Sequence, residues 1–267
     1  MDYQKIKLAI EGRVATITLC DPATLNAAGI DTIKELADAF GRVAGGKDEA
    51  RAVVLTGQGR GFCSGANLAG GGAAGRAAGE DGRPDAGNAL ENHYNPFVTL
   101  MRDFPMPIVT AVNGVAAGIG CSLALMGDII LAGESAYFLQ AFRRIGLVPD
   151  GGSTYLLPRM IGRARAMEMA LLGERVPAAK ALEWGLINRV VPDADLMAQA
   201  RTLAVELADG PKALGLIRKL MWQSLDADWQ EQLGNERDTQ RLAGKTEDFL
   251  EGVAAFLQKR PARFKGA

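Results

Sequence analysis

The feature that most constrains this 267-residue sequence is an almost wholly apolar segment, residues 107–131. Such a segment suits either a membrane-spanning helix or a strand and helix inside a globular core. Asn113, Asp128 and four glycines interrupt it, and Pro105-Met106-Pro107 leads into it. A spanning helix needs about 20 consecutive, predominantly apolar residues. We therefore predict a buried strand followed by a buried helix, and no association with a membrane.

Apolar residues recur at strand and helix spacings on both sides of this segment. Ile6, Leu8 and Ile10 alternate with polar neighbours, and residues 15, 17 and 19 repeat the alternation after a short turn, which predicts a β-hairpin. Helical spacing predicts helices over residues 33–43 and 89–102 and another that starts near Gly118. Strands are predicted at 52–56, 108–112 and 129–132. The recurring order of strands and helices predicts an α/β fold. Apolar residues at helical spacing from Leu196 onward predict a C-terminal helical region.

Composition excludes several classes of function. The 30 Lys and Arg residues are scattered and balanced by 31 Asp and Glu residues, so nucleic-acid binding is not expected. His93 is the only histidine, which argues against a Ser-His-Asp triad and a multi-histidine metal site. No metal-binding spacing is present, so no metal is predicted. The three cysteines are expected to be buried free thiols. The N-terminus lacks a signal or transit pattern, which predicts a cytoplasmic protein.

Three glycine-rich stretches are the candidates for chemistry. Residues 55–68 and 111–122 each begin at the end of a predicted strand. Glycine lets the backbone approach a ligand closely, but it is also common in ordinary loops. The second stretch begins a helix, whose N-terminus favours negative charge, although tight helix–strand packing explains the same glycines. In the third stretch, residues 145–154, Asp150 is either a turn residue or a catalytic acid/base. Together the three stretches supply an oxyanion hole and one carboxylate.

Two of these stretches resemble the crotonase (enoyl-CoA hydratase/isomerase) superfamily. Residues 62–68 resemble its first oxyanion loop, and residues 113–120 resemble its second. The resemblance runs from about Lys5 to the C-terminus. It implies a spiral of ββα units over residues 1–195 that holds the CoA site and the active site. It also implies a helical trimerisation region over residues 196–267, in a homotrimer or a dimer of trimers.

The resemblance also implies roles for individual residues. The backbone N–H groups of Ala66 and Ile119 would hold the oxygen of an acyl-CoA thioester. CoA arrives as part of the substrate, and no separate cofactor is implied. The implied CoA and substrate contacts, including two from a neighbouring subunit's C-terminal segment, are Asn26, Ala27, Ser64, Asn67, Leu68, Gly118, Phe142, Phe256 and Lys259.

The departures from the family pattern bear on the reaction. Hydratases of the superfamily carry glutamates where Ser122 and Phe142 stand, so hydratase activity is not expected. Asp150 stands where isomerases and a hydrolytic dehalogenase carry their single carboxylate. Residues 94–96, 145–151 and 236–244 are similar to those of the ring-1,2-epoxyphenylacetyl-CoA isomerases of phenylacetate degradation. Asn67, Ser153 and Leu25 differ from common family residues, and Leu25 replaces a basic residue.

These observations predict an acyl-CoA double-bond or ring-epoxide isomerase, in fatty acid or phenylacetate metabolism, with Asp150 as acid/base. Two alternatives remain open at this stage. Asp150 is a nucleophile in a hydrolase or dehalogenase, or the chain is a non-catalytic acyl-CoA-binding protein. Phe138, Phe142 and Tyr155 are candidates for lining an acyl pocket, and core packing explains each of them equally well.

Overall fold

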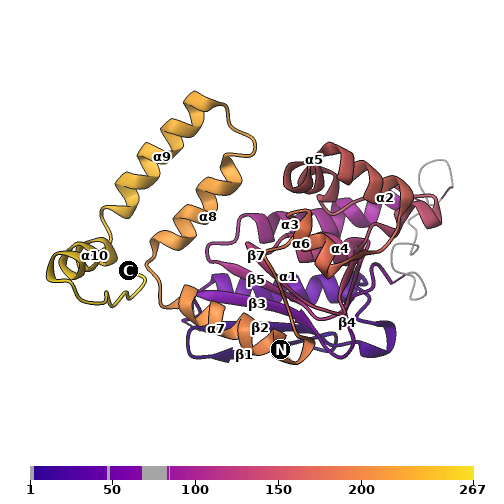
Figure 1. Ribbon diagram of the computed structural model, residues 1–267, viewed down its shortest axis with the longest axis horizontal. Coiled ribbons are helices and arrows are strands. Elements are labelled where there is room, and N and C mark those ends of the chain that lie inside the picture. Colours follow the sequence, from indigo (N-terminus) through magenta and orange to yellow (C-terminus); the bar gives the residue numbers. More distant parts are fainter. Residues whose placement is uncertain (1–2, 47–48, 68–82, 84) are drawn as a thin grey trace.

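The structure is a computed structural model that describes residues 3–46, 49–67, 83 and 85–267. Its body contains two β-sheets (Figure 1). The larger sheet has the order β1-β2-β3-β5-β7-β10, and the smaller has the order β4-β6-β8-β9. The strands are β1 (Ile6–Glu11), β2 (Val14–Leu19), β3 (Ala52–Gly57), β4 (Gly61–Cys63), β5 (Ile108–Val112), β6 (Val115–Ala117), β7 (Ile129–Gly133), β8 (Tyr137–Leu139), β9 (Val176–Pro177) and β10 (Arg189–Val191).

The helices cover the sheets and then continue beyond them. They are α1 (Ile30–Ala44), α2 (Ala86–Ala89), α3 (Asn95–Arg102), α4 (Ile119–Leu125), α5 (Ser153–Leu172), α6 (Ala178–Glu183), α7 (Leu196–Ala208), α8 (Ala213–Gln223), α9 (Trp229–Ala243) and α10 (Glu247–Gln258). A π-helical turn, Leu90–Tyr94, joins α2 to α3, and a 3-10 turn, Ala141–Ile145, follows β8.

A repeated strand–strand–helix unit links the two sheets. β3, β5 and β7 lie parallel in the larger sheet, and the strand that follows each of them lies in the smaller sheet. β4, β6 and β8 are also parallel to one another. This arrangement confirms the predicted α/β fold of ββα units, including the N-terminal hairpin and the strand at residues 108–112. The smaller sheet was not predicted, because residues 61–63 were interpreted as part of a glycine-rich loop.

Two layers of apolar residues cover the faces of the larger sheet. Alternate residues of a strand point to opposite faces. Val53 and Leu55 accordingly join the main core with α1, while Val54 packs in a second cluster with Leu203 of α7. Within the main core, the ring of Phe40 meets two other phenylalanine rings edge-on.

The apolar segment at residues 107–131 is divided between β5, β6, α4 and the start of β7. Nearly all of its residues are buried in the body. This confirms the predicted buried strand and helix. In the described part of the chain, no helix combines the length and the apolar composition that crossing a membrane requires.

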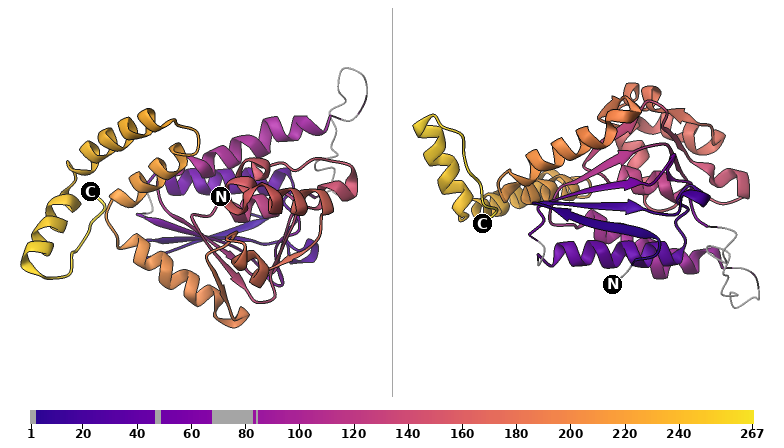
Figure 2. Two further views of the ribbon diagram at one scale, coloured as in Figure 1. Left: turned by 45° about the horizontal axis from the view of Figure 1, so that its top comes forward. Right: turned by 90° about the horizontal axis from the view of Figure 1, so that it is seen from below.

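The last three helices form an arm that extends from the body (Figures 1 and 2). Arg218 of α8 fastens this arm, with only 5% of its surface exposed. Its Nε lies 2.7 Å from Asp128 Oδ2. Its terminal nitrogens donate to the main-chain carbonyls of residues 101, 102 and 104, at the end of α3. One guanidinium therefore connects α8, α3 and the segment before β7.

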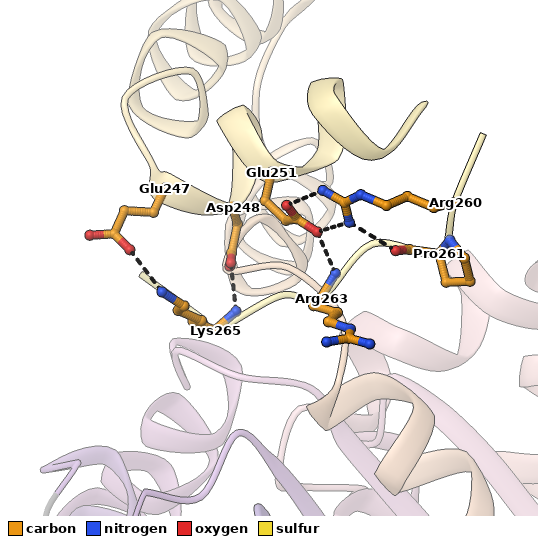
Figure 3. A pocket seen from close by; sticks show the side chains of 7 residues that line it. All are labelled: Glu247, Asp248, Glu251, Arg260, Pro261, Arg263 and Lys265. Carbon is orange, nitrogen blue, oxygen red and sulfur yellow. Dashed lines mark hydrogen bonds and ion pairs between the residues drawn. The ribbon is translucent and has the colours of Figure 1, made fainter. Parts of the chain in front are cut away.

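The C-terminal tail folds back on α10 (Figure 3). Glu251 accepts hydrogen bonds from both terminal nitrogens of Arg260 and from the main chain of Arg263. Asp248 accepts from the main-chain N–H groups of Lys265 and Gly266 and from that of Lys212, which precedes α8. The tail and the arm are therefore tied together at their base.

Candidate active site

A cavity of about 450 Å³ opens beside the smaller sheet. Most of its lining is apolar, and Asp150 is the only carboxylate among the described residues that line it. The lining comes from the ends of β4 and β6, from α2 and the π-helical turn, and from the 3-10 turn with the residues after it. The lining residues are Ser64, Gly65, Ala66, Ala86, Gly87, Ala89, Leu90, Tyr94, Gly118, Ile119, Ala141, Phe142, Arg144, Ile145, Leu147, Val148 and Asp150.

The first hydrogen-bond donor of the cavity follows β4. Gly65 has φ of +112°, a value that side chains rarely permit and that glycine adopts readily. Its carbonyl accepts a hydrogen bond from Ala28 N–H at 2.8 Å. Ala66 N–H belongs to the same peptide unit, and within the described chain it has no hydrogen-bond acceptor. It is therefore available to a ligand in the cavity.

The second donor follows β6, where α4 begins. Gly118 has φ of +54° and directly precedes the helix, and its own N–H donates to Leu139 O at 2.8 Å. Ile119 N–H, the first of the helix, has no acceptor among the residues described. Unpaired N–H groups at a helix N-terminus carry partial positive charge. Gly120 keeps α4 close to β4, because a Cβ there would lie 2.3 Å from Cys63 O.

The pairing of β4 with β6 brings these two donors together. Cys63 lies opposite Ala116 in the register of the smaller sheet, so the two strands end side by side. A Cβ placed on Gly118 would lie 3.8 Å from the Cα of Gly65. Two unpaired N–H groups that border one cavity are the components of an oxyanion hole.

Asp150 is held by its backbone and leaves its carboxyl group in the cavity. Its carbonyl accepts hydrogen bonds from Ser122 Oγ at 2.9 Å and from Ser153 Oγ at 2.8 Å. Its buried Oδ1 has no hydrogen-bond partner among the described residues. Burial raises the pKa of the Asp150 carboxyl to about 6. A group with this pKa exchanges protons near neutral pH.

The two positions that carry glutamate in hydratases have other roles here. Ser122 is fully buried, and its hydroxyl donates to Asp150 O. Phe142 lines the cavity, with its ring beside Gly118. Neither side chain titrates as a carboxyl group does. The site therefore combines two main-chain donors with one carboxylate.

The structure brings six of the predicted site residues to the cavity: Ser64, Ala66, Gly118, Ile119, Phe142 and Asp150. Leu68 lies outside the described residues. Asn26, Ala27 and Asn67 lie next to the cavity loops and do not line it. The Asn26 side chain is buried, and its amide donates to Gln58 O and Gly61 O.

The remaining predicted contacts lie elsewhere. Phe256 and Lys259 are on or next to α10, at the opposite end of the molecule from α2 and α4 (Figures 1 and 2). They therefore do not reach the cavity of their own chain. Phe138 is fully buried in the main core, and the hydroxyl of Tyr155 donates to Asp226 at 2.6 Å. Of the three aromatic candidates, only Phe142 lines the cavity.

Several lining residues were given no site role in the sequence analysis. Tyr94, Leu90 and Ile145 contribute to the wall. Ile145, Leu147 and Val148 are exposed apolar side chains in a row before Asp150. In the sequence, the available signal was this run of apolar residues beside a suspected carboxylate. The buried hydroxyl of Tyr94 gave no such signal, because its neighbours in the sequence are polar.

Comparison with known proteins shows which proteins the chain is similar to. The family model described as enoyl-CoA hydratase/isomerase matches residues 9–267. The chain is 45% identical to the 1,2-epoxyphenylacetyl-CoA isomerase of Escherichia coli K12, over 96% of this chain and 97% of that protein. It is 43% identical to a probable enoyl-CoA hydratase of Rhodobacter capsulatus, over the full length of both. A crystal structure of an enoyl-CoA hydratase subunit I from Geobacillus kaustophilus matches with a TM-score of 0.90 and 34% identity, and the match covers both chains completely.

Proposed function

The chain belongs to the enoyl-CoA hydratase/isomerase family, and from that premise we propose that it is an acyl-CoA isomerase that uses Asp150 as its acid/base. The observation that carries the proposal is the Asp150 carboxyl group, whose Oδ1 is buried without a hydrogen-bond partner among the described residues, in a cavity bordered by two N–H groups without acceptors. The substrates proposed are CoA thioesters with a movable double bond or a ring epoxide. Similarity to a 1,2-epoxyphenylacetyl-CoA isomerase supports the second of these.

In the proposed reaction, the Asp150 carboxylate removes a proton alpha or gamma to the thioester carbonyl. The electron pair of the C–H bond forms an enolate, whose negative oxygen is held by Ala66 N–H and Ile119 N–H. The protonated Asp150 then returns the proton at another carbon, which moves the double bond and regenerates the carboxylate. A single oxyanion donor contributes about 3 kcal/mol in comparable sites. Two donors therefore compensate for the modest basicity of a carboxylate with a pKa near 6.

Hydration would require a second acid/base group, and the described cavity lining provides one carboxylate. One group must activate water while another delivers a proton to carbon. Asp150 is the only carboxylate among the lining residues, and Ser122 donates its hydroxyl to Asp150 O. We therefore propose isomerisation over hydration. A panel of 2-enoyl-, 3-enoyl- and ring-epoxide phenylacetyl-CoA esters tests this. Faster hydration of 2-enoyl-CoA than isomerisation of every other ester would overturn the proposal.

The second candidate function makes Asp150 a nucleophile that attacks carbon. The same buried carboxylate favours this candidate too, since a poorly solvated carboxylate is more reactive. Turnover in deuterium oxide distinguishes Asp150 as a base from Asp150 as a nucleophile. A base exchanges substrate C–H hydrogens with the solvent during turnover, whereas a nucleophile gives a covalent ester that mass spectrometry of the quenched protein detects.

The activity is expected to depend on the ionisation of Asp150. Burial raises the pKa of this carboxyl to about 6, and the acting form is the carboxylate. We therefore expect kcat/KM to fall about tenfold per pH unit below pH 6 and to level off above it. The measurement is kcat/KM between pH 4.5 and 8.5. A profile that stays flat down to pH 4.5 would contradict Asp150 as the base.

We also propose assembly into a trimer or a dimer of trimers. Phe256 and Leu257 of α10 are 83% and 74% exposed, and they lie far from the cavity of their own chain. Burying them against another copy would remove apolar surface from water and place Lys259 beside a neighbour's CoA. Light scattering of the purified protein measures the assembly mass. A monomer at micromolar concentration would contradict this proposal.

A further inference from the structure

Tyr94 is a buried residue of the cavity wall for which the proposed reaction has no use. It ends the π-helical turn before α3, and 2% of its surface is exposed. Its hydroxyl donates to Ala28 O at 2.8 Å. A buried phenol usually needs such a partner. Its acceptor, Ala28, also forms a hydrogen bond to Gly65, so the position of Tyr94 bears on the loop that follows β4.

Ala28 also contacts the first oxyanion loop directly. Its N–H donates to Gly65 O at 2.8 Å. That carbonyl and Ala66 N–H are the two ends of one planar trans peptide, so they point in opposite directions. Holding Gly65 O against Ala28 therefore turns Ala66 N–H toward the cavity. Ala28 thus determines the direction of the first donor.

The backbone of this loop needs such an external restraint. Gly65 has φ of +112°, and a residue without Cβ does not limit rotation of the peptide that follows it. The Ala28 segment is restrained on its N-terminal side by Asn26, whose side chain donates to Gln58 O and Gly61 O. On its C-terminal side, the carbonyl of Ala28 is held by Tyr94 alone among the described side chains.

We propose that Tyr94 is a positioning residue that orients the Gly65–Ala66 peptide through Ala28, so that Ala66 N–H points at the thioester oxygen. The proposal rests on the proposed function for its kinetic consequence and on the hydrogen bonds alone for its geometry. Burial, together with the charge of Asp150, raises the pKa of the Tyr94 phenol to about 12. The hydroxyl therefore stays protonated, and remains a donor, throughout the working pH range.

The first experiment replaces Tyr94 with Phe, which keeps the ring and removes the hydrogen bond. Loss of one oxyanion donor costs about 10²–10³ in kcat, and a misdirected donor should cost less. We expect kcat to fall about 10–100-fold while KM changes less than threefold. Tyr3→Phe is the matched control, because it removes one tyrosine hydrogen bond, to Asp38, and neither residue lines the cavity. It should leave kcat unchanged.

The second measurement reads the geometry without turnover. The infrared stretch of an isotope-labelled thioester carbonyl moves to lower frequency when main-chain donors polarise it. A non-reactive saturated acyl-CoA is bound to the wild type and to each variant. We expect the shift to shrink in Tyr94→Phe and to persist in Tyr3→Phe. Replacing Tyr94 with 4-aminophenylalanine supplies an N–H donor at the same place and should restore the shift, which also covers the case in which Tyr94→Phe does not fold.

The outcomes separate the two proposals. If the wild type turns over no ester but the carbonyl shift behaves as expected, the isomerase proposal fails and the role of Tyr94 stands. If the carbonyl shift does not shrink in Tyr94→Phe, the role of Tyr94 is wrong. If Tyr94→Phe does not fold, a carbonyl shift in the 4-aminophenylalanine variant that is smaller than in the wild type has the same consequence. A loss of kcat in Tyr94→Phe with an unchanged carbonyl shift would also overturn it, since that result assigns Tyr94 to proton transfer.

Discussion

Replacing Asp150 with Asn is expected to lower kcat by about 10²–10⁴-fold, the contribution typical of a positioned acid/base. The amide has nearly the same size as the carboxyl group and cannot accept the proton. The hydroxyls of Ser122 and Ser153 donate to the main-chain carbonyl of residue 150 and not to its carboxyl group, so the local backbone should stay in place. Binding of acyl-CoA esters, measured by isothermal titration calorimetry, should change less than about threefold.

Two further measurements sharpen this test. Asp238→Asn on α9 is the control, because it removes a carboxylate that is exposed and paired with Arg237 on the arm. It should retain wild-type kcat. Retention of more than one tenth of the wild-type kcat by Asp150→Asn would contradict the proposed role. The folded state raises the pKa of Asp150 from 3.8 to about 6, so it binds this proton more tightly than the unfolded state. Stability is therefore lost as the pH rises from 3.8 to about 6, and this loss is complete at pH 7. Asp150→Asn removes the ionisable group and should raise the melting temperature at pH 7.

Replacing Arg218 with Met is expected to lower the free energy of unfolding by about 3–5 kcal/mol. The change leaves the Asp128 carboxylate without its 2.7 Å partner. It also leaves the three main-chain carbonyls at the end of α3 without this donor. Because the same guanidinium fastens α8 to the body, the arm should loosen as well. Urea denaturation followed by circular dichroism measures the loss.

Two variants test the cause of that loss. Arg201→Met breaks an exposed ion pair with Glu11 and should cost less than about 1 kcal/mol. Adding Asp128→Asn to Arg218→Met removes the uncompensated charge, while its amide oxygen still accepts from Ile108 N–H. The double variant should regain part of the lost stability. Equal costs for Arg218→Met and Arg201→Met would rule out a buried-charge explanation.

Elements that carry a complete apolar pattern were predicted well from the sequence. β5 was predicted within its observed bounds, and α4 begins one residue after the predicted Gly118. β4, β6 and β8 have three residues each, which is too short for an alternating pattern to appear. Yet two of these short strands, β4 and β6, position the two unpaired N–H groups, so the geometry of the site depends on the part of the fold that was hardest to predict.

The role of individual site residues was predicted less completely. Asp150 follows proline and precedes glycine, and a turn explains that sequence as well as catalysis does. Only the structure shows that its Oδ1 is buried and that it lines the same cavity as Ala66 and Ile119. Arg218 occurs within an ordinary amphipathic pattern, and nothing near it in sequence marks its buried partners. Its four acceptors are more than 80 residues away along the chain, a separation that local patterns do not capture.

The N–H donors of the cavity and much of its apolar wall come from different residues, which has a consequence for protein engineering. Its donors come from strand ends in the smaller sheet, whereas much of its apolar wall comes from two separate stretches, residues 86–90 and 145–148. Mutagenic libraries limited to Leu90, Ile145, Leu147 and Val148 therefore alter the shape offered to the acyl chain without touching the donors or Asp150. The residues that shape the apolar wall are thus different from Asp150 and from the two N–H donors, so the wall can be diversified while the proposed chemical groups are held constant.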